Sequence, residues 1–297
     1  MPGPGAPAPL TPTDAAPLRQ SLTLGDATYD LTHRALVMGI LNRTPDSFYD
    51  RGATFALDAF FERAEALAEA GADILDVGGV KAGPGDYVGE DEELDRVVGA
   101  IEALVRRFDV PVSVDTWRAS VARASYRVGA VMGNDISGFG DPDYLAVAAE
   151  AGAAVVATHI RLAPRVADPD PHYDDVVAEV AAFLAERVER ALAAGVGADR
   201  IVVDAGLDLG KTAEQSLTLL RASAELADLG YPLLLSASNK TFLGVTLDLE
   251  IGERGPASLA ATALGVSRGC RVVRVHDVAG SRQVCDVLAA VSGAGED

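Results

Sequence analysis

The chain has 297 residues, more than a usual single domain but compatible with an α/β barrel of about 250 residues. Its 44 acidic and 25 basic residues give a net charge of −19, which repels nucleic acid and anionic membranes and excludes both as expected partners. The two cysteines, Cys270 and Cys285, lie in apolar runs without metal-ligand spacing, so we expect buried thiols in a cytoplasmic protein.

The first 20 residues contain six prolines and are expected to form a disordered tail, followed by one domain over residues 21–297. No later run approaches the roughly 18 consecutive apolar residues of a membrane span. Eight short β-branched runs then alternate with longer amphipathic stretches rich in Ala and Leu. We expect strands over 35–42, 72–79, 110–116, 131–137, 153–160, 201–206, 232–238 and 272–277.

Helices are expected to begin near Leu57, Glu90, Arg118, Asp143, Asp174, Ala213 and Pro256, and after Gly280. Eight strands paired with eight helices predict a (β/α)8 TIM barrel, with a doubly wound sheet as the alternative. No strong GxGxxG motif follows any strand, which disfavours a dinucleotide-binding fold.

The predicted strands are apolar at first and polar where they end. One such polar end can be a helix cap or a loop anchor, but the carboxyl ends of barrel strands share one face, where active sites are built. The polar ends therefore predict a site at this face. They are Asn42, Asp76, Asp115, Asn134, Asp135, His159, Asp204, Ser238, Lys240, Arg274 and His276.

Lysine is rare in this arginine-rich chain, and Lys81, Lys211 and Lys240 are its three examples. All three follow predicted strands. A compact ammonium retained in such loops indicates a function that a planar guanidinium cannot perform, although coincidence remains an alternative.

Several motifs resemble the dihydropteroate synthase family, pterin-binding TIM barrels of folate biosynthesis, from about Arg34 to the C-terminus. The chain is most similar to a divergent actinobacterial paralogue group of that family, which shares VKAGPG and SNK. The motifs are GILNRTPDSF (39–48), GADILDVGG (71–79), VSVDTWRA (112–119), NDISG (134–138), DAGLDLGK (204–211), SNK (238–240) and RVHDV (274–278).

The resemblance implies transfer of a pterin methylene from 6-hydroxymethyl-7,8-dihydropterin diphosphate to 4-aminobenzoate, with diphosphate leaving. It places Asp115, Asn134, Asp204 and Lys240 around the pterin, where carboxylates accept from ring and amino N–H groups. A purely structural Asp204–Lys240 ion pair is the alternative for that pair.

The catalytic residues implied at the diphosphate end are Asn42, Arg274 and His276, together with Lys240. The resemblance also implies Mg²⁺ as cofactor, with Asn42 as its ligand. For His276 a buried core histidine remains the alternative.

The second loop and the seventh strand depart from the family pattern. Val80, Lys81, Ala82 and Gly83 replace the family's Glu-Ser-Thr-Arg. Asn239 replaces an arginine between Ser238 and Lys240, and Asp208 replaces a glycine. Compared with the family pattern, the chain loses two arginines in these loops and gains two other cations, Arg43 and Lys81. We assign Arg43, Lys81, Asp208, Ser238 and Asn239 to the acceptor side and its altered loops.

These departures predict a synthase-type transferase with weak or altered acceptor activity. The alternative is a non-catalytic pterin-binding regulator, while a pterin-dependent methyltransferase ranks last because the chain has no room for a corrinoid domain. The resemblance further implies a homodimer, formed through the apolar outer face of the segment SLAATALGV (258–266).

Overall fold

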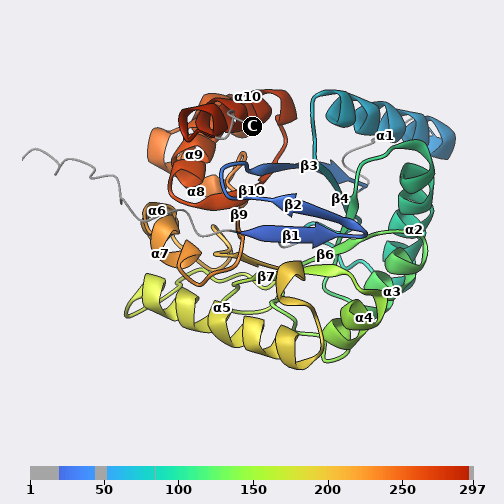
Figure 1. Cartoon of the computed structure of the whole chain (residues 1–297), viewed down its shortest axis with the longest axis horizontal. Helices are drawn as coiled ribbons and strands as arrows, with labels where there is room; N and C mark the ends of the chain where they lie inside the picture. The colour runs from blue at the N-terminus through green and yellow to red at the C-terminus, as the bar shows by residue number, and fades with distance from the viewer. Residues whose placement is uncertain (1–19, 44–51, 84, 294–297) are drawn as a thin grey trace, which may run out of the picture.

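The computed structural model describes residues 20–43, 52–83 and 85–293, except the side chains of residues 52–56 (Figure 1). The expected disordered tail lies outside these residues, apart from Gln20. Most of the polar loop after the first barrel strand, residues 44–51, also lies outside them.

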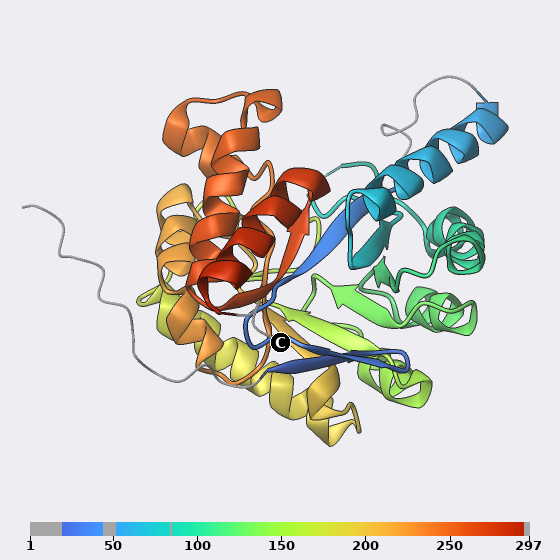
Figure 2. The ribbon, with the colours of Figure 1, turned by 45° about the horizontal axis from the view of Figure 1, so that its top comes forward.

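Eight parallel strands close into a barrel in the order β10-β3-β4-β5-β6-β7-β8-β9, which confirms the predicted TIM barrel (Figure 2). Each predicted strand is present, and most are shorter than expected. Their bounds are β3 Leu36–Asn42, β4 Ile74–Gly78, β5 Val112–Asp115, β6 Met132–Asp135, β7 Ala154–Thr158, β8 Ile201–Asp204, β9 Leu233–Leu235 and β10 Cys270–Val275.

The helices surround the barrel as an outer layer (Figure 1). Their bounds are α1 Gly52–Glu69, α2 Glu90–Arg107, α3 Ala119–Arg127, α4 Tyr144–Ala151, α5 Val176–Ala193, α6 Ala213–Arg221, α7 Ser223–Ala227, α8 Thr241–Leu247, α9 Gly255–Ser267 and α10 Val278–Val291. The expected starts agree within about two residues except for two helices. Helix α1 begins five residues earlier than Leu57, and α10 begins at Val278 instead of after Gly280. The short helices α7 and α8 were not expected.

A β-hairpin that was not expected precedes the barrel. Its strands β1, Ser21–Leu24, and β2, Ala27–Asp30, pair antiparallel across a turn that begins at Gly25, whose φ is 59°. The buried Leu22 and Leu24 belong to the same apolar cluster as the residues inside the barrel. The hairpin therefore closes the amino-terminal end of the barrel and leaves the carboxyl end for a site (Figure 2).

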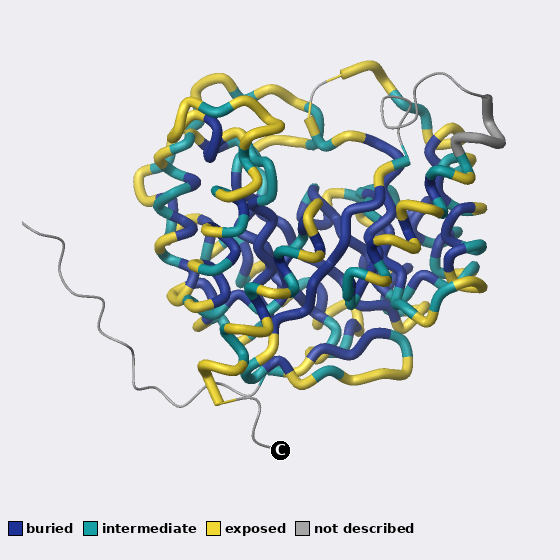
Figure 3. Tube along the Cα trace, turned by 90° about the horizontal axis from the view of Figure 1, so that it is seen from above, coloured by how far each residue is buried: buried dark blue, intermediate teal, exposed yellow. Residues whose placement is uncertain are grey.

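The barrel interior follows the two-residue period of its strands. The inward residues are mostly even-numbered, but on β5 they are the odd-numbered Ser113 and Asp115. The inward residues nearer the strand starts form an apolar layer with the hairpin. Figure 3 shows this buried interior as the dark centre of the trace, with exposed loops at its rim. The strand residues in the layer are Leu36, Met38, Ile74, Met132, Ala154, Val156, Val202, Leu234 and Val272.

Both cysteines are buried free thiols, as expected. Within the described ranges, no helix combines the length and the apolar character that crossing a bilayer requires.

Candidate active site

Strand register places three of the expected site positions in one row across the barrel mouth. Asn42 pairs with Gly78, Gly78 pairs with Asp115, and Asp115 pairs with Asn134. Further around the barrel, Asp204 on β8 pairs with Leu234 on β9. The carboxyl ends of the strands therefore bring Asn42, Asp115, Asn134 and Asp204 to one face, as predicted.

Arg274 connects three strands at the centre of this face. Its Nε donates to Oδ2 of Asp76 and its Nη2 donates to Oδ2 of Asp115, each at 2.6 Å. Asn134 Nδ2 also donates to Asp76 Oδ2, at 3.1 Å. The sequence singled out Asp76 only as a polar strand end, yet its carboxylate joins the arginine to the amide.

Burial shifts the ionisation of these carboxyl groups. It raises the pKa of Asp115 to about 7, against the opposing effect of Arg274, and the negative charge of Asp76 raises it further. Burial also raises the pKa of Asp204, partly offset by the charge of Lys240. Asp76 Oδ1 is buried without a hydrogen-bond partner among the described residues, so it is an acceptor that a ligand N–H group would satisfy.

Lys240 lies beside Asp204 at the same face but donates to a backbone group. Its Nζ is 2.5 Å from the carbonyl oxygen of Leu207, in the loop after β8. Asp204 Oδ1 accepts from the N–H of Gly206 at 2.8 Å. The loop after β8 thus orients both groups and leaves their remaining hydrogen-bonding positions for a ligand.

Ser238 and His276 contact each other at the ends of β9 and β10. Ser238 Oγ lies 3.0 Å from His276 Nδ1 and accepts from the His276 backbone N–H at 3.2 Å. His276 is exposed, which excludes the alternative of a core histidine. Arg63 of α1 donates to the His276 carbonyl at 2.8 Å and joins that helix to the site.

Two of the polar strand ends face the helix layer and do not belong to this cavity. Asp135 accepts from the backbone N–H groups of Ser137 and Phe139, at 2.7 and 3.0 Å, and so anchors a loop. His159 packs edge-on against Phe183 of α5, with 4.7 Å between ring centroids. On β6 and β7 the inward positions are even-numbered, so Asp135 and His159 face outward.

Lys211 is a buried cation behind the loop after β8, and sequence reasoning noted it without assigning it to the site. Its Nζ is 2.9 Å from His159 Nδ1, 2.9 Å from the Gly206 carbonyl and 3.0 Å from the Leu209 carbonyl. Burial lowers its pKa to about 7. Lys211 therefore acts on the site indirectly, by holding the loop that carries Leu207 and Asp208.

The residues assigned to the altered loops lie in different surroundings. The Arg43 guanidinium lies 5.9 Å from the ring centroid of Phe60 on α1, so it packs on an aromatic face. Lys81 is exposed in the loop after β4, and the neighbouring Ala82 carbonyl accepts from the Arg165 N–H at 3.2 Å. Asp208 and Asn239 both have left-handed backbone conformations, with φ of 67° and 58°.

The oxygens at the mouth fit Mg²⁺ only in part. No group of three or more His, Cys, Asp or Glu side chains is arranged to hold a metal ion in the part of the chain that the structure describes. Asn42 is exposed, and a Cβ at Gly78 would lie 3.3 Å from its Oδ1 and 3.5 Å from Asp115 Oδ2. One amide oxygen suits Mg²⁺, which takes few protein ligands when substrate phosphates complete its shell.

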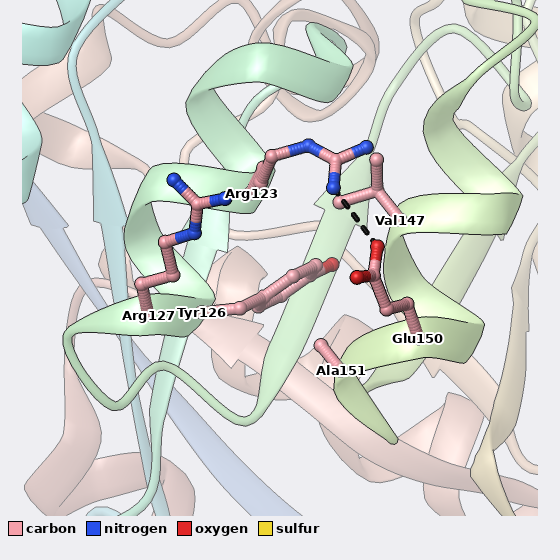
Figure 4. A pocket seen from close by; sticks show the side chains of 6 residues that line it. All are labelled: Arg123, Tyr126, Arg127, Val147, Glu150 and Ala151. Atoms are coloured by element: carbon pink, nitrogen blue, oxygen red, sulfur yellow. Dashed lines mark hydrogen bonds and ion pairs between the residues drawn. The ribbon is translucent and has the colours of Figure 1, made fainter.

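A separate hollow lies between α3 and α4, on the outside of the barrel (Figure 4). Arg123 and Glu150 form an ion pair of 2.9 Å at its edge. A Cβ at Gly133 would lie 2.2 Å from the hydroxyl of Tyr126, so only glycine lets this tyrosine pack against the strand that carries Asn134. This hollow is therefore distinct from the candidate site.

The fold is a TIM barrel, and its polar mouth at the carboxyl face of the strands is a candidate site for a small molecule. A family model for pterin binding enzymes matches residues 38–276, and the chain belongs to that family. This confirms the resemblance found in the motifs.

Named relatives place the chain among the dihydropteroate synthases. It is 46% identical over 270 residues to "Inactive dihydropteroate synthase 2" of Mycobacterium leprae, covering 88% of this chain and 91% of that protein. It is 41% identical over 273 residues to the dihydropteroate synthase of Synechocystis sp., covering 91% and 94%. The solved dihydropteroate synthase of Xanthomonas albilineans with 4-aminobenzoic acid has a TM-score of 0.85 and 38% identity, covering 92% of this chain and 98% of that one.

The raised pKa of Asp115 predicts how stability depends on pH. Because the folded state holds this proton more tightly than the unfolded state, its contribution to stability is complete below about pH 4 and is lost as the pH rises through about 7. In Asp115→Asn this titration is absent, so the free energy of unfolding should fall less than that of the unmodified protein as the pH rises from about 4 to about 7. The difference between the two proteins should be a few kcal/mol at most. Urea unfolding at several pH values measures it.

The exposed Asp26→Asn in the hairpin turn is the matched control for the loss of one carboxylate. It should retain the pH profile of the unmodified protein. Identical profiles for the unmodified protein and Asp115→Asn would contradict the assigned shift.

Proposed function

We propose that this chain binds 6-hydroxymethyl-7,8-dihydropterin diphosphate at the carboxyl mouth of its barrel and is a dihydropteroate synthase-type transferase with weak or altered acceptor activity. The observation that carries the proposal is the arrangement of Asp115, Asn134 and Asp204 around one mouth, with Lys240 beside Asp204. Membership of the pterin binding enzymes supports it.

The pterin would be recognised by acceptors facing its N–H groups. Asp115 and Asp204 accept from the amino and ring N–H groups, while Asn134 and Lys240 donate to ring acceptors. The unpartnered oxygen of Asp76 offers one further acceptor. These polar groups lie above an apolar layer, and this combination suits a flat heterocycle with polar edges.

The diphosphate would leave near Asn42, Arg274 and His276. As the C–O bond breaks, negative charge grows on the leaving group, and cationic or N–H donors there stabilise the transition state more than the ground state. Mg²⁺, held by Asn42 and the phosphates, would supply further charge neutralisation when bound. The acceptor amine attacks directly, so the reaction requires no protein nucleophile.

The altered loops support the weak or altered acceptor step. The solved relative from X. albilineans carries 4-aminobenzoic acid, and another structure of it carries 7,8-dihydropteroate. The name of the M. leprae relative describes that protein as inactive. A pterin-binding regulator remains the second candidate, but retention of Asn42, Arg274 and His276 favours a site that also binds diphosphate.

We also propose a cytoplasmic homodimer. Its interface would lie on the outer face of the last helices, where Leu264 of α9 is 38% exposed and Val287 and Val291 of α10 are 63% and 79% exposed. The buried free thiols suit a reducing compartment.

Pterin recognition can be tested with Asp204→Asn. The substitution replaces one acceptor oxygen with a donor facing the pterin N–H, which should weaken binding about 5- to 150-fold, or roughly 1 to 3 kcal/mol. Calorimetry with pterin diphosphate measures it, and the exposed Asp228→Asn at the other end of the barrel is the matched control. Unchanged affinity in Asp204→Asn would refute the pterin site.

The role of Asn42 can be tested through its dependence on Mg²⁺. Asn42→Ala should weaken the Mg²⁺-dependent part of pterin diphosphate binding by about tenfold, since one oxygen ligand is lost. Binding of 6-hydroxymethyl-7,8-dihydropterin without the diphosphate should change little. Equal losses for both ligands would show that Asn42 contacts the pterin or supports the fold.

The acceptor step can be tested by a turnover assay with 4-aminobenzoate. We expect slow turnover or none, because removal of one preorganised donor can cost about 100- to 1,000-fold in rate and two arginines of the family pattern are replaced. Substitution back to that pattern (Val80→Glu, Lys81→Ser, Ala82→Thr, Gly83→Arg and Asn239→Arg) should raise turnover. Rapid turnover by the unmodified protein would contradict the altered acceptor step.

A further inference from the structure

Asp208 spans the gap between the loop after β8 and the start of α8. Its Oδ2 accepts from the N–H of Thr241 at 2.5 Å, and its Oδ1 accepts from the N–H of Phe242 at 3.2 Å. The Asp208 N–H lies 3.2 Å from Ser216 Oγ, which fixes the backbone of this residue. The left-handed φ of 67° turns the side chain toward α8.

This contact adjoins the cation of the candidate site. Leu207 and Asp208, adjacent in one loop, bind Lys240 and Thr241, adjacent in the other. Burial lowers the pKa of Lys240, while the negative charges of Asp204 and Asp208 both favour its charged form. A further anion arriving here meets a cation whose charge is already balanced.

The neighbouring guanidinium of Arg254 is also engaged and offers no free cation for an incoming anion. Arg254 Nη1 donates to the carbonyls of Asn239 and Lys240, at 3.0 and 3.3 Å, and its Nε donates to the Leu249 carbonyl at 3.2 Å. These bonds hold the loop between β9 and α8 in shape. Asn239, which stands where the family pattern has an arginine, adds no charge.

The contact between Asp208 and α8 is accessible. A cavity of about 190 Å³ borders it, lined by residues that include Asp208, Lys211, Thr241, Phe242 and Val245. An incoming carboxylate that sought the N–H groups of Thr241 and Phe242 would have to displace Asp208, which is tethered to them at high effective concentration. The displaced carboxylate of Asp208 would then repel the carboxylate of the incoming acceptor.

We propose that Asp208 is a specificity-determining residue that excludes acceptors carrying a carboxylate, so that the acceptor of this chain is an amine without an anionic substituent. This inference rests on the proposed function, since it concerns the acceptor side of that same site. The reaction is otherwise unchanged. The amine nitrogen bonds to the pterin methylene, the C–O electron pair leaves with diphosphate, and the amine releases a proton to water.

The test compares two acceptors that differ in charge, 4-aminobenzoate and 4-aminobenzamide. Binding of each is measured by calorimetry on protein saturated with 6-hydroxymethyl-7,8-dihydropterin, diphosphate and Mg²⁺, a mixture that cannot turn over. The unmodified protein should bind the amide at least about tenfold more tightly, since like charges brought together cost several kcal/mol. Asp208→Gly should tighten 4-aminobenzoate by about tenfold or more and leave the amide within about threefold.

Two further variants complete the design. Asp208→Asn removes the charge, keeps an acceptor oxygen and tolerates the left-handed conformation, so it should shift preference in the same direction if the glycine variant is unstable. Asp248→Gly is the matched control, because Asp248 is an exposed aspartate with φ of 55° at the other end of α8. It should bind both acceptors as the unmodified protein does.

The outcomes separate this inference from the proposed function. If the unmodified protein binds the pterin but neither Asp208 variant changes the preference between the two acceptors, the inference is wrong and the proposed function stands. If Asp248→Gly changes the preference as much as Asp208→Gly does, the role of Asp208 is also refuted. Failure of the unmodified protein to bind the pterin would overturn both.

Discussion

The arrangement of this site depends on the pairing of Arg274 with Asp76 and Asp115. The guanidinium comes from β10 and reaches the carboxylates of β4 and β5, at 2.6 Å each, so one residue joins three strands at the mouth of the barrel. Its side chain is only 17% exposed. A charge so poorly hydrated must be paired, and the arginine in turn opposes the burial that raises the pKa of Asp115. Replacing any of the three alters the other two.

The barrel can hold this charged layer because the layers beneath it are apolar. Asp76, Asn134 and Arg274 point inward at the mouth. The residues two positions earlier on the same strands, Ile74, Met132 and Val272, point inward in the layer beneath. The hairpin then closes the far end with leucines. Stability therefore comes from the lower layers, while the upper layer retains partly satisfied polar groups that a ligand can bind.

The sequence predicted the eight strands and the face on which the site lies, because a parallel barrel places all strand ends together. The strand pattern did not show that Asn134 and Asp204 face the cavity while Asp135 and His159 face the helices. A polar residue at a strand end can face inward or outward, and strand register decides which. The even-numbered period distinguishes them once the strands are paired. The hairpin was missed although Gly25-Asp26 between two short alternating runs is a recognisable turn. The contact of Asp208 with α8 joins separate loops and was beyond local patterns.

The departures from the family pattern lie in loops at the mouth, after β3, β4, β8 and β9. Three of the four groups proposed to face a pterin, Asp115, Asn134 and Asp204, lie on the strands themselves, where register constrains them. Asp208 and Asn239 lie in loops, and each takes a left-handed conformation in which a glycine or an asparagine costs little. A substitution there can change charge without disturbing the barrel. In the proposed function, the acceptor can therefore change through these loops while the pterin site on the strands stays the same.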